Sequence, residues 1–284
     1  MDERYWLVTT EHLVDRLWFK DELDFAEGMN ALAVSSFRCG VVVFAFNLMS
    51  NHSHSVVGGE RVRVERYINS FKRLHSRYMT LKYGGWELLR ENGVDIRELS
   101  LHDESFERAI AYVQMNPVAA NITLNPEGYP WGTGNCFFNI STPAGRKASE
   151  FSGRELARIL HFRETIPDDY IIDSRGFIDP RSYVRVDVVE SVFRTPKRMN
   201  YYLSSSSKAK FMKEVPSFED QVVSMAAKSL CVSLFRKGSM GELIREQASE
   251  LLKQLRYRFS ADPKQLARVT GLQYPEVCAM LDSV

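Results

Sequence analysis

The sequence GVVVFAFNLMSNHSHSVV, residues 40–57, decides the fold of the first half of the chain. Residues 40–46 form a continuous apolar run, which is typical of a β-strand buried on both faces. Ser50 and Asn51 are common turn residues, so we expect the chain to reverse there and to form a second strand from His52. Because side chains alternate along a strand, His52 and His54 would point to the same side. The pair is either part of a metal site or two polar residues on a solvent-facing surface.

The sequence before and after this hairpin predicts further strands and helices. Residues 5–10, YWLVTT, are aromatic and β-branched and predict a strand. Asp21 is a suitable N-cap for a helix over 22–37. A short strand is expected within NGVDIREL, residues 92–99.

A long helix is predicted over residues 61–82, where apolar residues recur with the helical period. Its apolar face consists of Val64, Tyr67, Ile68, Phe71, Leu74, Tyr78 and Leu81. Gly84 is a natural C-cap for it. Another helix is expected to run from Ser105 to Asn116 and to end there, because Pro117 disfavours its continuation. Together these elements predict an α+β fold with a small antiparallel sheet layered with helices.

The second half of the chain has a different character. Residues 125–134 are rich in turn residues and should cross the surface, and residues 170–178 predict a hairpin. Residues 217–284 are mainly helical. We therefore divide the chain into an α+β domain (1–140), a linker and accessory segment (141–216) and a helical domain (217–284).

The last two predicted helices form a candidate helix-turn-helix. Asp262-Pro263 opens the first helix, Gly271 closes it, and Pro275 lies in the first turn of the second. Their core positions are Ala267, Leu272, Val277 and Leu281. The second helix lacks an Arg or Asn that could recognise a base, so a pair of packing or partner-binding helices is the alternative.

Composition limits the class of protein. The four cysteines lie far apart and include no CxxC pair, which disfavours a zinc ribbon and a disulfide framework. No apolar run approaches the length of a membrane span, and the N-terminus lacks the pattern of a secretory signal. We therefore expect a cytoplasmic protein that does not enter a membrane. Residues 1–140 carry 14 Lys and Arg against 18 Asp and Glu, so any surface that binds nucleic acid must be local.

Basic residues are concentrated in the predicted helix 61–82. Seven Lys and Arg side chains lie there against Glu65. A solvated helix face is one explanation. The other is contact with the phosphates of a nucleic acid, for which Arg66, Lys72, Arg73 and Arg77 are the candidates.

The segment AYVQMNP, residues 111–117, supplies side chains that could join the two histidines. Tyr112 and Asn116 are four residues apart and project from the same face of a helix. If this helix crosses the sheet, it brings a phenol and an amide oxygen toward the imidazoles. Divalent metals often combine imidazole with oxygen ligands, so the histidines gain the further ligand that a metal site needs.

Three segments in order resemble the REP-associated tyrosine transposases, which belong to the HUH superfamily of single-strand endonucleases and transposases. They are LMSNHSH (48–54), FKRLHSRYMTLKYG (71–84) and AIAYVQMNPVAANITLNPEGYPW (109–131). The resemblance covers about residues 5–138. It implies a ferredoxin-like HUH catalytic domain in which Tyr112 is the nucleophile. By the same resemblance, His52, His54 and Asn116 bind a divalent metal, Mg²⁺ or Mn²⁺.

The activity implied by the resemblance is cleavage and rejoining of single-stranded or hairpin DNA through a 5′-phosphotyrosine intermediate, as in DNA transposition and recombination. A phenol with a pKa near 10 is a poor nucleophile but a tolerable leaving group, which suits a reversible covalent step. Because many related enzymes complete the site across two subunits, a homodimer stays open. The alternatives are a non-catalytic DNA-binding regulator with the same fold, and a metal phosphoesterase that uses water in place of tyrosine.

Overall fold

The chain forms two compact units in the structure, a computed structural model that describes residues 4–11, 16–84, 93–162, 165–209 and 218–282. The first unit comprises residues 1–11, 22–49 and 53–212. The second comprises residues 12–21, 50–52 and 213–284. The segment 141–216, which the sequence sets apart as linker and accessory segment, therefore lies with the first unit as far as residue 212.

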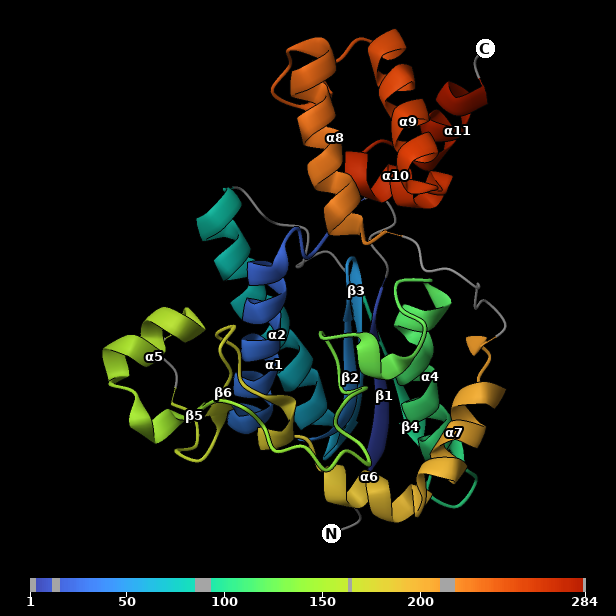
Figure 1. The fold of residues 1–284 in the computed structure, drawn as a ribbon. Coiled ribbons are helices and arrows are strands. Elements are labelled where there is room, and N and C mark those ends of the chain that lie inside the picture. The colour runs from blue at the N-terminus through green and yellow to red at the C-terminus, as the bar shows by residue number, and fades with distance from the viewer. Residues whose placement is uncertain (1–3, 12–15, 85–92, 163–164, 210–217, 283–284) are drawn as a thin grey trace. The chain divides into compact units, whose positions relative to one another are not determined.

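A four-stranded antiparallel sheet forms the centre of the first unit (Figure 1). Its strands are β1 (Tyr5–Thr10), β2 (Val42–Met49), β3 (His52–Gly58) and β4 (Val94–Leu99), in the order β2-β3-β1-β4. The helix α1 (Glu22–Cys39) joins β1 to β2, and α2 (Arg61–Tyr83) joins β3 to β4. This order and connectivity are those of the ferredoxin-like β-α-β-β-α-β arrangement. The predicted α+β fold is confirmed, and so is the hairpin that turns at Ser50 and Asn51.

Helices cover the two faces of the sheet. Ser55 and Tyr67 lie 3.3 Å apart through their hydroxyls, so the odd-numbered β3 side chains face α2. His54, on the opposite face, contacts α4 (Ser105–Ala119). The helix α2 ends at Gly84, whose φ of 72° is a conformation that glycine adopts without strain. Most of the expected apolar face of α2 is buried, but Leu81 is 78% exposed.

Short elements complete the first unit. They are β5 (Arg146–Lys147), α5 (Gly153–Leu160), β6 (Ile171–Ile172), α6 (Val186–Phe193), α7 (Pro196–Ser205) and the single-turn helices Pro126–Gly128, Ala148–Glu150 and Pro180–Ser182. The predicted hairpin within residues 170–178 is present, with an antiparallel bridge between Ile172 and Ile178 and a turn at Gly176. Within the described residues of the whole chain, no helix combines the length and the apolar character that crossing a membrane requires.

The turn-rich segment 125–134 corrects a prediction, because part of it is buried instead of crossing the surface. Trp131 is 5% exposed and stacks on Phe25 with ring centroids 4.9 Å apart. The backbone pairs with the outer edge of β2 through an antiparallel bridge between Asn47 and Gly132. A side chain at position 132 would press on the carbonyl oxygen of Phe46, which explains the glycine. The segment completes the sheet edge, and turn propensity alone does not reveal such a long-range contact.

Pro117 corrects a second prediction, because α4 continues past it to Ala119. A proline lacks the N–H that would bond to the carbonyl oxygen four residues earlier, here that of Val113. The side chain of Asn47 in β2 donates a hydrogen bond to this oxygen at 3.2 Å. The helix therefore tolerates the proline, because a side chain from strand β2 donates to the carbonyl oxygen that has lost its partner within the helix.

Asn47→Ala should destabilise the chain by about 1–2 kcal/mol, because it leaves the buried Val113 carbonyl without this donor. In a Pro117→Ala background the new N–H can bond to the same carbonyl, so Asn47→Ala should then cost less. Chemical denaturation of the four chains of this double-mutant cycle measures the difference. Equal costs in both backgrounds would contradict the coupling.

The second unit is helical, as predicted from the sequence. Its helices are α8 (Asp220–Phe235), α9 (Arg245–Phe259), α10 (Pro263–Thr270), α11 (Tyr274–Asp282) and the single turn Met240–Glu242. Leu251, Leu252 and Leu255 of α9 are fully buried among residues from the other three long helices. The side chain of Asp262 caps α10, and Gly271 ends it with a φ of 74°. The two helices of the candidate helix-turn-helix are thus present, with Val277 of α11 in the core.

Candidate active site

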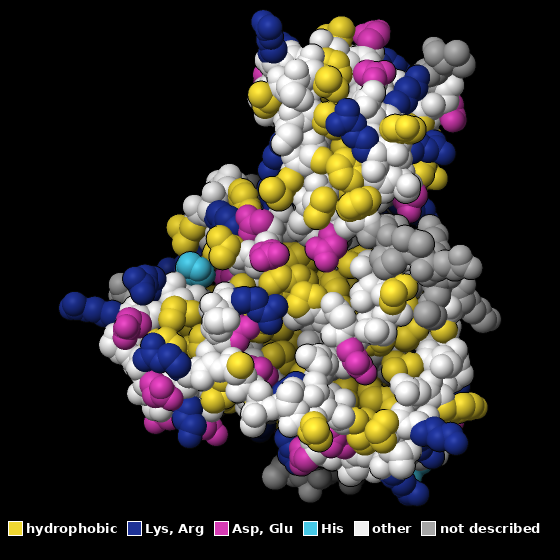
Figure 2. Space-filling view, in the orientation of Figure 1, with side chains coloured by type: hydrophobic (Ala, Val, Ile, Leu, Met, Phe, Trp, Pro, Cys, Tyr) yellow, Lys and Arg dark blue, Asp and Glu magenta, His cyan; other side chains and the backbone are white. Residues whose placement is uncertain are grey.

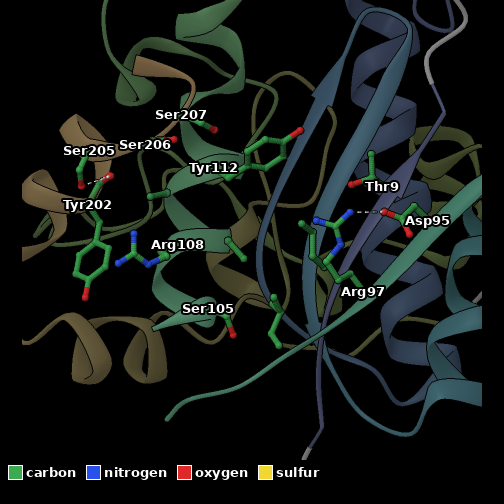
Figure 3. Close-up of a pocket in the computed structure, with 14 residues that line it drawn as sticks. Thr9, Asp95, Arg97, Ser105, Arg108, Tyr112, Tyr202, Ser205, Ser206 and Ser207 are labelled. Carbon is green, nitrogen blue, oxygen red and sulfur yellow. Dashed lines mark hydrogen bonds and ion pairs between the residues drawn. The ribbon is translucent and has the colours of Figure 1, made fainter. Parts of the chain in front are cut away.

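A pocket of about 640 Å³ lies between α4, α7 and the face of the sheet formed by β1 and β4 (Figure 3). Its walls are formed by Leu7, Thr9, Asp95, Arg97, Leu99, Ser105, Arg108, Ala109, Ala111, Tyr112, Tyr202, Ser205, Ser206 and Ser207. Strand pairing explains the sheet side. Leu7 pairs with Arg97 and Thr9 pairs with Asp95, so all four side chains lie on one face.

Tyr112 projects from α4 toward the strands, as Figure 3 shows. Its ring meets the imidazole of His54 edge to face, with centroids 5.3 Å apart. On the ring, the ammonium nitrogen of Lys208 lies 4.9 Å from the centroid. Burial raises the pKa of the Tyr112 phenol above its ordinary value, and the positive charge of Arg97 opposes this rise. Burial likewise lowers the pKa of Lys208.

The two histidines lie two residues apart on β3, so alternation directs both side chains to one face of that strand. Nδ1 of His54 lies 3.0 Å from the hydroxyl oxygen of Thr9, its pairing neighbour on β1. Nδ1 of His52 lies 2.8 Å from the side-chain oxygen of Asn51. The Asn51 oxygen is an acceptor, which favours the His52 tautomer with its proton on Nδ1 and the lone pair on Nε2, whereas the Thr9 hydroxyl can accept from or donate to Nδ1 of His54.

Asn116 lies one turn after Tyr112 on α4 and is only 4% exposed. Its side-chain nitrogen donates to the backbone oxygen of Tyr112 at 2.8 Å. This bond fixes the orientation of the amide and leaves its oxygen as the atom that a ligand can use.

These side chains fit a divalent metal in chemical type. Metal-binding histidines commonly engage one ring nitrogen with an oxygen and coordinate through the other, and at both His52 and His54 it is Nδ1 that lies beside an oxygen. Asn116 offers a hard oxygen ligand, and a mixed set of imidazole and oxygen ligands suits Mn²⁺ or Mg²⁺. In the described part of the chain, no group of three or more His, Cys, Asp and Glu side chains is placed to hold a metal. A site here therefore depends on the amide oxygen.

Two arginines, Arg97 and Arg108, line the pocket together with one carboxylate, that of Asp95. Arg97 extends from β4 and pairs with Asp95 at 3.2 Å (Figure 3), and Arg108 pairs with Glu104 at 3.0 Å. Neither arginine was predicted from the sequence as a site residue. The alternation Asp95, Arg97, Leu99 within the predicted strand could have shown that Arg97 shares a face with Thr9. Nothing in the sequence marks Ser205, Ser206 and Ser207 as pocket residues, because α7 is far away along the chain.

The basic residues predicted on α2 are not brought to this pocket, since α2 covers the other face of the sheet. Arg66, Arg73 and Arg77 are exposed on α2. Lys72 differs from them, because it is buried at 9% exposure and burial lowers the pKa of its ammonium group. Of the four predicted phosphate contacts, three therefore lie on the surface.

Comparison with known proteins gives no match for this chain, whether with protein-family models, with curated proteins or with solved structures.

Proposed function

We propose that the chain is a metal-dependent tyrosine transposase that cuts and rejoins single-stranded or hairpin DNA. The observation that carries the proposal is the contact between Tyr112 and His54, with their ring centroids 5.3 Å apart beside a pocket that contains Arg97 and Arg108. A half-buried phenol, an imidazole and two guanidinium groups suit attack on an anionic phosphodiester. The resemblance of residues 48–54, 71–84 and 109–131 to the REP-associated tyrosine transposases supports the same reaction.

The covalent step exchanges one phosphoester bond for another. The Tyr112 oxygen attacks a backbone phosphorus and loses its proton. The bond from phosphorus to the 3′ oxygen breaks, and that oxygen takes up a proton to become a 3′ hydroxyl. The protein is then joined to the 5′ phosphate. Attack of a 3′ hydroxyl on the phosphotyrosine reverses the exchange and releases the tyrosine.

The residues around Tyr112 divide the work of this step. His52, His54 and Asn116 would hold the metal, which supplies positive charge to polarise a phosphate oxygen. Arg97 and Arg108 hold the phosphate in the pocket and balance its negative charge. The ammonium group of Lys208 lies over the phenol ring, 4.9 Å from its centroid, and restricts the position of the ring.

Incubation of the chain with structured single-stranded DNA and Mn²⁺, followed by a denaturing gel, tests the proposal. We expect a band in which the protein is joined to the 5′ phosphate of the 3′ part of the cut strand, together with a free 3′ hydroxyl on the 5′ part. Cleavage without this adduct would indicate a phosphoesterase that uses water. Binding with neither cleavage nor adduct would indicate a DNA-binding regulator. Both outcomes would reject the tyrosine mechanism.

Arg97→Gln should slow formation of the adduct by about tenfold, because it removes a positive charge that faces the reacting phosphate. The rate of adduct formation at saturating DNA is the measurement. Arg185→Gln is a matched control, since Arg185 also pairs with an exposed aspartate two residues away, Asp187, but lies outside the pocket. Arg97→Lys should restore part of the rate. Equal rates for the parent chain and Arg97→Gln would remove Arg97 from the mechanism.

A further inference from the structure

A second pocket, of about 670 Å³, lies between α2 and α5 in the first unit. We call it the α2–α5 pocket. Arg77, Tyr78 and Lys82 come from α2, and Arg158, His161 and Phe162 come from the end of α5 and the residues after it. Its volume is in the range of pockets that hold small organic ligands. In Figure 2, Lys and Arg side chains, with Asp and Glu between them, lie over the side of the molecule where Figure 1 shows α5.

The charge of the α2–α5 pocket favours an anion. None of the described residues that line it is acidic. Lys82 is paired with the buried Asp24 at 2.7 Å, so its charge is already balanced. Within the described part of the chain, no acidic side chain forms an ion pair with Arg77 or with Arg158. Two guanidinium groups therefore remain to bind phosphate, which they can do with two parallel hydrogen bonds.

The aromatic side chains favour a flat ring beside that anion. The rings of Tyr78 and His161 lie with their centroids 5.2 Å apart. The buried His75 stacks on Tyr78 with ring centroids 6.2 Å apart, and the Glu27 carboxylate binds Nδ1 of His75. Tyr78 is thus a supported platform. A planar base that stacks there would also cover Leu81, an apolar side chain left 78% exposed.

The pocket is continuous with the exposed basic stripe of α2. Arg66, Arg73 and Arg77 are seven and four residues apart, a spacing that places them on one face of a helix. All three are exposed, and Arg77 also lines the pocket. A strand whose phosphates follow this stripe therefore arrives at the pocket with its next base beside Tyr78 and Phe162. A mononucleotide would leave Arg66 and Arg73 unused.

We infer that the α2–α5 pocket binds one base of a single DNA strand, with the neighbouring phosphates held by Arg77 and Arg158. This inference rests on the proposed function for its substrate class, but the pocket is formed by α2 and α5, and α2 covers the face of the sheet opposite to that of Tyr112. It is thus a second DNA-binding site that holds a strand away from the site of cleavage.

Fluorescence anisotropy of a labelled oligo-dT with the full chain tests the inference, in a Tyr112→Phe background that prevents covalent capture. Phe162→Leu should weaken binding by about tenfold, because one base loses its stacking partner. Arg158→Gln should weaken binding and lower the slope of log affinity against log salt by about 0.7, the value for one phosphate contact on a single strand. Arg154→Gln is the matched control, because Arg154 is an exposed residue of α5 that does not line the pocket.

An oligonucleotide of abasic sites keeps the phosphates and removes the bases. On this strand, Phe162→Leu should bind as the background chain does, whereas Arg158→Gln should still bind more weakly. Unchanged affinity of Phe162→Leu for oligo-dT would overturn the inference, and so would an equal loss on the abasic strand. Displacement of the strand by dTMP as effectively as by unlabelled oligo-dT would also overturn it, in favour of a mononucleotide site. Equal melting temperatures would show that the variants are folded.

The adduct assay of the parent chain separates this inference from the proposed function. An adduct together with unaltered binding by Phe162→Leu rejects only the second site. Absence of an adduct together with weakened binding by Phe162→Leu rejects only the tyrosine chemistry.

Discussion

Tyr112→Phe should abolish both covalent capture of DNA and strand cleavage, while the fold and the affinity for DNA are retained. The change removes one oxygen atom, the nucleophile of the proposed reaction. The phenyl ring keeps its edge-to-face contact with His54 and its contact with Lys208, so the packing around it should not change. We expect cleavage to fall by about a thousandfold or more, since no other group in the mechanism can form the bond to phosphorus.

A denaturing gel with Mn²⁺ measures both products in one experiment, and anisotropy measures binding. Tyr202→Phe is the matched control, because Tyr202 also lines the pocket but its hydroxyl lies 3.4 Å from Arg198 at the α7 side. It should cut DNA at nearly the parent rate. Cleavage by Tyr112→Phe as fast as by the parent chain would show that the assignment of the nucleophile is wrong.

Asp220→Ala should destabilise the second unit by about 3–5 kcal/mol, because it breaks a buried ion pair and leaves one charge without its partner. Asp220 is 4% exposed at the start of α8. One of its oxygens accepts hydrogen bonds from Ser50 at 2.6 Å and from Arg268 at 2.9 Å. The other accepts from Gln265 at 3.0 Å and again from Arg268, at 3.1 Å. The carboxylate thereby connects α8 with α10 and with residues 50–52.

Hydrogen exchange at the amides of α8 and α10 in the full chain should show this loss directly, as faster exchange within the second unit. Urea denaturation followed by circular dichroism gives the free energy. Glu246→Ala, at an exposed position in the first turn of α9, is the control and should change stability by less than about 0.5 kcal/mol. Unchanged protection of α8 in Asp220→Ala would show that the ion pair does not hold these helices together.

Local patterns in the sequence were sufficient for most of the sheet and its helices. Alternation and turn residues predict β3 and the placement of His52 and His54 on one face, because both depend on neighbours along the chain. The helical period and Gly84 predict α2 and its end for the same reason. Local patterns alone did not predict the contact between Tyr112 and His54. Its prediction also depended on the order of three segments that are separate in the sequence.

Features that depend on distant residues were missed. The continuation of α4 past Pro117 depends on Asn47, and burial of Trp131 depends on Phe25 and on the edge of β2. Lys72 was grouped with three exposed arginines because composition does not distinguish the sides of a charged helix. The pocket beside Tyr112 depends on α7, whose position no local pattern specifies. Tertiary contacts decide each of these cases, and they override the local preference of the residue concerned.

The covering of the β2 edge by later segments has a consequence for synthesis of the chain. Leu48 donates its backbone N–H to Trp131 at 2.9 Å, and Arg185 donates to Val43 at 2.9 Å. During translation, β2 leaves the ribosome long before residues 131 and 185 are synthesised, so the edge of β2 lacks these partners at that stage. An open strand edge pairs readily with other chains, and domains fold largely as units during translation. The nascent first unit thus passes through a vulnerable stage, which is when a chaperone would protect it best and when a translational pause before residue 185 would do most harm.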